Sequence, residues 1–204
     1  MKFTHSNILE KMIKALIGMG IISAAAVIPS PTKIPDVAVK SEPVKLPVIE
    51  YKSWKCPDCN ENEKYVLEKL QLHTRISDRN ALATIMGNIK SESNFHPNIC
   101  EGGARIPYQE CTRGGYGLIQ WTSAGRYANL GKFCTRHECD PSSLEGQTRY
   151  MINESVFQRY LTEFEGNGGT IQQYMVPAYY WLGWGIKGHR EQYAYDYSNK
   201  LVLS

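Results

Sequence analysis

A glutamate at the end of an apolar helical stripe is the residue best suited to acid–base chemistry in this sequence. Apolar side chains recur at spacings of i, i+3, i+4 and i+7 in Leu82, Ile85, Met86 and Ile89. Glu92 continues this stripe three residues after Ile89, so its carboxyl group is expected to be withdrawn from water. Desolvation favours the protonated form, and a carboxyl group protonated near neutral pH can serve as a general acid. The alternative is that Glu92 turns toward solvent where the helix frays.

A glycine-rich segment follows, residues 115–122, which reads GYGLIQWT. Glycines such as Gly117 let a backbone approach a ligand closely, and the rings of Tyr116 and Trp121 have faces that suit stacking on sugars. The Gln120 amide can donate hydrogen bonds to, and accept them from, hydroxyl or acetamido groups. The structural alternative for this segment is a tight turn followed by a core tryptophan.

Taken together, the two segments resemble the motif pair of a known family of enzymes. Residues 87–93 read GNIKSES and residues 115–121 read GYGLIQW. The phage tail lysozyme family has a similar pattern, G-N-x-x-x-E-S followed by G-x-G-x-x-Q-W, and related motifs occur in soluble lytic transglycosylases and goose-type lysozymes. The resemblance extends more weakly to Arg126, Leu130, the SLEGQ sequence that begins at Ser143, the helix ending near Glu154, Tyr179-Tyr180 and the Arg190-x-x-x-Ala194 segment.

This resemblance implies a role for each matching residue. Glu92 matches the catalytic glutamate that protonates a glycosidic oxygen. The residues implied to bind the saccharide are Gln120, Tyr116, Gly117, Trp121 and Tyr179. Tyr179 resembles the cleft tyrosine of the transglycosylases, although its context, YYWLGWG, departs from their Y-N-A-G pattern.

A second catalytic carboxylate is not evident from the sequence. Most glycosidases use two, about 5–5.5 Å apart when they retain configuration and about 6.5–9.5 Å apart when they invert it. The other acidic residues near the motifs have no motif support and are interpreted as solvated charges: Glu101, Glu110, Asp140, Glu145 and Asp196. This is compatible with a single-acid mechanism completed by the substrate's own N-acetyl group or C6 hydroxyl.

The expected activity is cleavage of the β-1,4 bond between N-acetylmuramic acid and N-acetylglucosamine in peptidoglycan, with Glu92 as acid and then base. The alternatives are a lytic transglycosylase that forms 1,6-anhydro products and a catalytically silent cell-wall-binding virion protein. No cofactor is expected. The expected partners are peptidoglycan glycan strands and phage tail proteins, and the expected location is the virion tail or, after export, the host periplasm or inner-membrane surface.

Helical periodicity dominates the residues that must position these groups. Helices are expected over residues 60–73, from residue 77 or 78 onward, and near residues 123–133, 143–165, 170–182 and 189–201. No segment shows sustained alternation of apolar and polar residues. The predicted fold class is mainly α, a lysozyme-like α+β domain with a small irregular or β lobe between residues 94 and 122.

The first 55 residues differ from the rest of the chain. Lys2, Lys11 and Lys14 precede a chargeless apolar stretch over residues 15–28, which is typical of an export signal. A bilayer-spanning helix takes about 20 residues, so this stretch is short for one. The alternatives are an uncleaved anchor that contacts the membrane through residues 15–28, and a buried helix. Residues 29–55 are proline-rich and predict an extended linker, so the catalytic domain is expected over residues 56–204.

The distribution of charge argues against a nucleic-acid partner. The net charge is +3, but residues 1–55 carry eight lysines and four acidic residues, whereas residues 56–204 carry 15 basic and 16 acidic residues. A nucleic-acid-binding domain concentrates basic charge on its folded part, and this domain does not.

All six cysteines follow the linker, and an even number behind an export segment predicts disulfides. The simplest pairing joins neighbours: Cys56 with Cys59, Cys100 with Cys111, and Cys134 with Cys139. Other connectivities are possible. A zinc site is a further alternative, with Cys56 and Cys59 as one half and Cys134, His137 and Cys139 as the other, although C-x-x-H-x-C is not the usual partner spacing.

Overall fold

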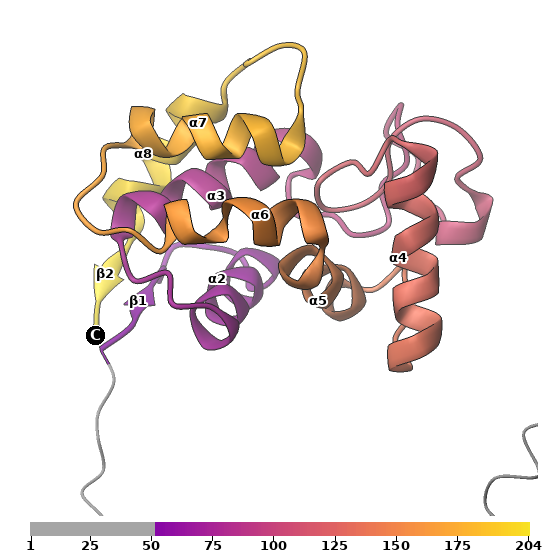
Figure 1. Cartoon of the computed structure of the whole chain (residues 1–204), viewed down its shortest axis with the longest axis horizontal. Helices are drawn as coiled ribbons and strands as arrows, with labels where there is room; N and C mark the ends of the chain where they lie inside the picture. The colour runs from indigo at the N-terminus through magenta and orange to yellow at the C-terminus, as the bar shows by residue number, and fades with distance from the viewer. Residues whose placement is uncertain (1–51) are drawn as a thin grey trace, which may run out of the picture. The chain divides into compact units, whose positions relative to one another are not determined.

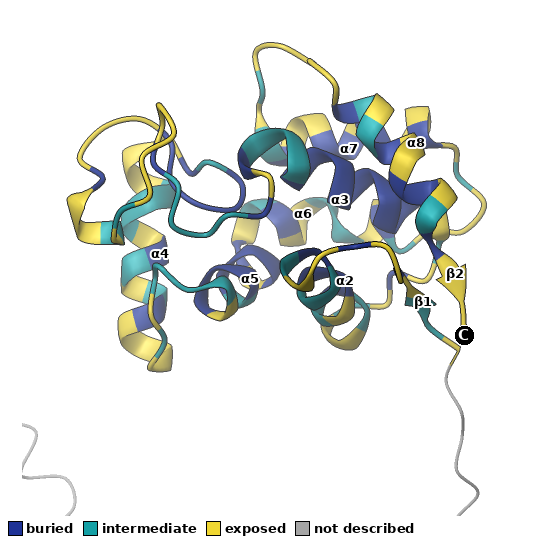
Figure 2. Ribbon diagram, turned by 180° about the vertical axis from the view of Figure 1, so that it is seen from behind, coloured by how far each residue is buried: buried dark blue, intermediate teal, exposed yellow. Residues whose placement is uncertain are grey.

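Helix α3 (Arg79–Ser93) lies at the centre of the structure, a computed structural model that describes residues 52–204. It packs chiefly on α8 and α7, and also on α2, and most of its length is buried (Figures 1 and 2). The other elements in chain order are β1 (Trp54–Lys55), α2 (Glu61–His73), η2 (Tyr108–Glu110), α4 (Ala124–His137), α5 (Leu144–Asn153), α6 (Ser155–Phe164), α7 (Ile171–Leu182), α8 (Arg190–Lys200) and β2 (Val202–Leu203). The mainly α fold class is confirmed.

Local sequence explains where α3 begins and which face it buries. Asp78 is the N-cap residue, and its side chain accepts hydrogen bonds from the backbone N–H groups of Asn80 and Ala81 at 2.8 and 3.1 Å. The apolar stripe that includes Leu82 and Ile89 is fully buried. The helix therefore brings its last turn, which contains Glu92, to the edge of the core.

A glycine contact brings α8 close to α3. A Cβ atom at Gly87 would lie 2.5 Å from the backbone nitrogen of Ala194 and 2.9 Å from the carbonyl oxygen of Arg190. No real Cβ tolerates these distances, so only glycine allows the two helices to approach this closely. The contact places the first residue of α8, Arg190, beside the last turn of α3.

The helical pattern over residues 143–165 is two helices, α5 and α6, which meet at Glu154, where the family resemblance implies that a helix ends. The backbone of Glu154 is extended, with φ −66° and ψ 133°. Its buried carboxylate accepts two hydrogen bonds from Arg126, from Nε at 2.6 Å and from Nη2 at 2.7 Å. This tertiary interaction accompanies a helix break at a position where the sequence has neither glycine nor proline.

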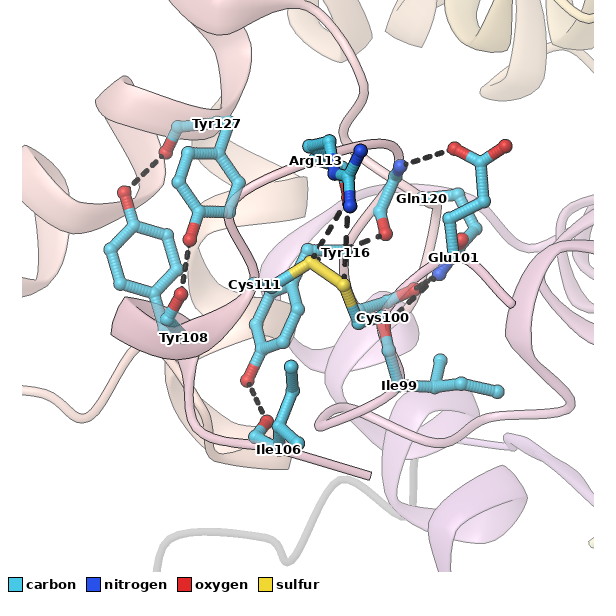
Figure 3. Close-up of a disulfide and its surroundings, with 12 residues drawn as sticks. Ile99, Cys100, Glu101, Ile106, Tyr108, Cys111, Arg113, Tyr116, Gln120 and Tyr127 are labelled. Atoms are coloured by element: carbon cyan, nitrogen blue, oxygen red, sulfur yellow. Dashed lines mark hydrogen bonds between the residues drawn. A yellow bond between two sulfur atoms is a disulfide. The ribbon is translucent and has the colours of Figure 1, made fainter. Parts of the chain in front are cut away.

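Residues 94–122 form the small irregular lobe that the sequence predicts. Isolated β-bridges join Ile99 to Arg105 and Cys100 to Tyr116. The lobe is fastened to α4 by two tyrosines, shown in Figure 3. The Tyr108 hydroxyl donates to the carbonyl of Tyr127 at 2.9 Å, and their rings stack with centroids 4.3 Å apart.

The cysteines pair with their near neighbours. Disulfides join Cys56 to Cys59, Cys100 to Cys111, and Cys134 to Cys139, with Cα–Cα distances of 5.3, 5.7 and 4.5 Å. Disulfide-bonded sulfurs are not thiolates, and thiolates are what a zinc site needs. The zinc alternative is therefore not supported.

The two ends of the described chain meet in a small sheet. β1 pairs with β2 in antiparallel fashion, so residues 54 and 55, which the sequence assigns to the linker, join the folded domain. The predicted signal or anchor (residues 1–28) and the linker up to residue 51 lie outside the described residues. Within residues 52–204, none of the helices has the length and apolar character needed to cross a membrane.

Substituting Gly87 with alanine is expected to destabilise the domain. The added methyl group would push α8 away from α3, which should lower the free energy of unfolding by about 1–3 kcal/mol. Urea denaturation would measure the change. Gly125 in α4 is the matched control, because a Cβ there meets nothing within 4 Å, and alanine at that position should stabilise the domain by up to about 1 kcal/mol. Equal effects at the two positions would contradict this account of the α3–α8 contact.

Candidate active site

A pocket of about 460 Å³ opens at the C-terminal end of α3. Three segments that are distant in sequence form it: the last turn of α3, the end of the 115–122 loop, and the connection from α7 to α8. The residues that line it are Glu92, Ile119, Gln120, Thr122, Leu182, Gly183, Trp184, Gly185, Ile186 and Arg190.

An ion pair fixes the orientation of Glu92. The Nη2 atom of Arg190 donates to Oε1 of Glu92, and the two side chains are 9% and 14% exposed. Arg190 is itself held in place, because its Nη1 atom donates to the carbonyl oxygens of Ile186 and Lys187, both at 3.1 Å. Its guanidinium also lies over the Trp184 ring, 4.9 Å from the centroid. The carboxylate is therefore held by a rigid partner.

The Glu92 carboxyl group has one oxygen available to a ligand. Arg190 contacts Oε1, and no donor among residues 52–204 hydrogen-bonds to Oε2. The sequence leads to an expectation of burial alone, whereas the structure also places the Arg190 guanidinium against this carboxyl group. The arrangement can support transfer of a proton to a bound group and stabilise the anion that remains.

Ser93 of α3 and Gln147 of α5 anchor the 115–122 loop to two helices. The buried Ser93 hydroxyl donates to the carbonyl oxygen of Leu118 at 2.8 Å. The Oε1 atom of Gln147 accepts a hydrogen bond from the N–H of Leu118, also at 2.8 Å. Gly117 has a φ of 74°, and a Cβ there would lie 2.2 Å from Gln147 Oε1. Glycine at this position is therefore required for the loop to reach its anchor.

Gln120 lines the pocket from a strained backbone. Its φ is 51°, in the left-handed region that non-glycine residues adopt rarely. The Nε2 atom donates to the carbonyl oxygens of Gly117 at 3.0 Å and Ile99 at 3.3 Å. In the described part of the chain no donor contacts Oε1, so this oxygen can accept a hydrogen bond from a ligand.

Tyr116, Gly117 and Trp121 lie in the core, beneath the loop surface. The Tyr116 hydroxyl donates to the carbonyl oxygen of Ile106 at 3.0 Å (Figure 3), and burial raises the pKa of this phenol. Trp121 is fully buried against Tyr150, with ring centroids 5.3 Å apart. None of the three lines the pocket, and their contacts hold the loop against the core.

Tyr179 lies outside the pocket but next to one of its walls. The side chain is half exposed, and its ring meets that of Trp184 edge to face, with centroids 5.4 Å apart. Trp184 lines the pocket, so Tyr179 adjoins its rim.

Within residues 52–204, Glu92 is the one acidic residue that lines the pocket. The carboxylate of Glu101 accepts a hydrogen bond from the backbone N–H of Gly115 at 2.9 Å, within the lobe (Figure 3). Glu145 pairs with Arg149 on the surface of α5. Neither contributes a second carboxylate to the pocket.

Two residues that matter here have no role predicted from the sequence. Arg190 belongs to a weak motif match without an assigned function, and Trp184 matches no motif position. A pairing between residues that lie 98 positions apart has no signal in a single sequence.

Comparison with known proteins gives one match. The sequence model of a family described as phage tail lysozyme matches residues 61–201. The matched region contains every helix from α2 to α8 and all the residues that line the pocket. No curated protein and no solved structure matches the chain.

A double-mutant cycle would test the ion pair. Arg190→Met removes the cation and leaves a largely buried carboxylate unpaired, which should lower the free energy of unfolding by about 2–4 kcal/mol. In a Glu92→Gln background the loss of unfolding free energy caused by Arg190→Met should be smaller by at least about 1 kcal/mol, because no unpaired carboxylate is left behind. Urea denaturation of the four proteins gives the coupling, and equal losses in the two backgrounds would show that the pair contributes nothing.

Proposed function

Because this chain belongs to the phage tail lysozyme family, with that family's lysozyme-like role in degrading peptidoglycan, we propose that the Glu92 pocket cleaves the β-1,4 bond between N-acetylmuramic acid and N-acetylglucosamine. The observation that carries the proposal is that Glu92 and Gln120 line one open pocket. Each also has a side-chain oxygen that no donor in the described residues contacts. A saccharide in this pocket can therefore meet both groups at once.

In the proposed reaction Glu92 first acts as an acid. Because Glu92 pairs with Arg190 in the structure, the carboxyl group must take up a proton before it acts. It then donates that proton to the glycosidic oxygen, and the bond from C1 to that oxygen breaks. Glu92 becomes a carboxylate at that moment, and the adjacent Arg190 guanidinium stabilises the new negative charge. Such stabilisation acts where charge develops, which is where an electrostatic contribution lowers a barrier.

The carboxylate then acts as a base. It accepts a proton from a water molecule that attacks C1, or from the substrate's C6 hydroxyl, and the catalytic acid is restored. Water gives a reducing-end sugar, and the C6 hydroxyl gives a 1,6-anhydro ring. Among the described residues that line the pocket Glu92 is the one acidic side chain, which supports a mechanism in which the substrate's N-acetyl group stabilises the cationic centre. Gln120 Oε1 would accept the N–H of such a group.

We further propose that the N-terminal region delivers this domain to the cell wall. Residues 1–28 would direct export or provide an anchor, and residues 29–51 would extend the domain away from that point. A location in the phage tail, or in the host periplasm at the inner membrane, would bring the pocket to its substrate.

Mass analysis of muropeptides tests the reaction. Purified peptidoglycan would be incubated with the full chain and, separately, with its Glu92→Gln variant. Loss of the acid should reduce product formation at least about 100-fold while the variant stays folded. Glu145→Gln is the matched control, because this exposed glutamate lies on α5, outside the pocket, and its substitution should leave product formation unchanged.

The products separate the alternatives. Reducing-end muropeptides from the wild type alone identify a hydrolase, and products lighter by one water molecule identify a lytic transglycosylase. If well-folded wild type gives no product, the proposed activity is wrong and a wall-binding role replaces it. Full activity of Glu92→Gln would remove Glu92 from the mechanism.

A further inference from the structure

The outer face of α7 carries apolar side chains that the proposed reaction does not use. Val176, Tyr179 and Tyr180 are 55%, 47% and 58% exposed. Residues three and four positions apart lie on the same side of a helix, so Val176 shares a face with both tyrosines. Single exposed apolar residues are common, whereas large contiguous apolar patches indicate binding surfaces.

The tyrosines belong to a row of four aromatic rings. Tyr180 stacks on Tyr160 of α6, with centroids 5.8 Å apart and planes inclined by 22°. Tyr179 contacts Tyr180 edge to face at 5.3 Å and Trp184 at 5.4 Å. Helices α6 and α7 run side by side (Figure 1), so the row crosses from one helix to the next. The packing holds each ring in a defined orientation before any ligand arrives.

The row leads directly into the Glu92 pocket. Trp184, its last ring, lines that pocket and packs against Arg190. Leu182 and Gly183, which follow the two tyrosines at the end of α7, also line it. The aromatic surface is therefore continuous with the place where the glycosidic bond is proposed to break.

A second hollow lies at the other end of the same face. It has a volume of about 530 Å³, and Val176 is part of its wall. Its polar lining includes Asn167 and Gln173, whose amides can donate and accept hydrogen bonds. The exposed face of α7, a helix of 12 residues and so about 18 Å long, thus connects two hollows.

We propose that this α7 face, formed by Tyr160, Val176, Tyr179 and Tyr180, is an extended saccharide-binding surface. It would hold the part of the glycan strand that lies beyond the sugars at Glu92. The apolar faces of pyranose rings pack on aromatic rings, and the tyrosine hydroxyls can hydrogen-bond to sugar hydroxyls. A pocket of this size encloses a small ligand, whereas the substrate is a polymer that must continue over the neighbouring surface. The choice of a glycan as the ligand rests on the proposed function.

Titration calorimetry with saccharides of two lengths tests the proposal. The protein is the full chain carrying Glu92→Gln, so that bound sugars stay intact, and the probes are the disaccharide and hexasaccharide of β-1,4-linked N-acetylglucosamine. Adding Tyr180→Ala should weaken hexasaccharide binding about three- to tenfold, the effect of losing one aromatic contact, and leave disaccharide binding unchanged. Tyr180→Phe keeps the ring and should retain at least half of the hexasaccharide affinity.

Tyr195→Ala is the matched control, because this tyrosine is also exposed but lies on α8, outside the aromatic row. It should leave binding of both probes unchanged. The proposal is overturned if Tyr180→Ala binds the hexasaccharide as tightly as its parent, or if the parent shows no preference for the longer probe. These outcomes are distinct from failure of the proposed activity, which is measured as the absence of cleavage products from wild type.

Discussion

The ion pair between Glu92 and Arg190 joins the two halves of the chain at the candidate active site. It forms because Gly87 lets α8 approach α3 within a distance that any side chain would prevent. The guanidinium is in turn fixed by two backbone carbonyls and by the Trp184 ring. A carboxyl group that must give and take a proton at a defined atom needs such rigidity, and here the tight packing of two helices supplies it.

Much of the fold follows from local physics and was predictable for that reason. The N-cap and apolar stripe of α3 lie within one segment, and each disulfide joins cysteines that are near neighbours in sequence. The family resemblance indicates that a helix ends near Glu154, but the bidentate contact of this residue with Arg126, 28 residues away, was not predictable from local sequence. Residues 54 and 55 join the domain only because β2, at the far end of the chain, pairs with them.

The candidate site likewise has some features that local sequence predicts and others that depend on distant contacts. The motif pair singles out Glu92 and Gln120 for chemical reasons, and the structure places both at one pocket. The glycine-rich loop has no periodicity from which the buried face could be read, so sequence alone could not show that Tyr116 and Trp121 point into the core. The partner of Glu92 comes from the other end of the domain, and only the folded chain reveals it.

The most direct test of this account is a crystal structure of the full chain carrying Glu92→Gln with a bound peptidoglycan saccharide. In that structure a glycosidic oxygen is expected within hydrogen-bonding reach of the side chain at position 92. An acetamido N–H of the saccharide is also expected to donate to Gln120 Oε1. A saccharide bound elsewhere on the domain, or bound with the side chain at position 92 out of reach of any glycosidic oxygen, would contradict this account.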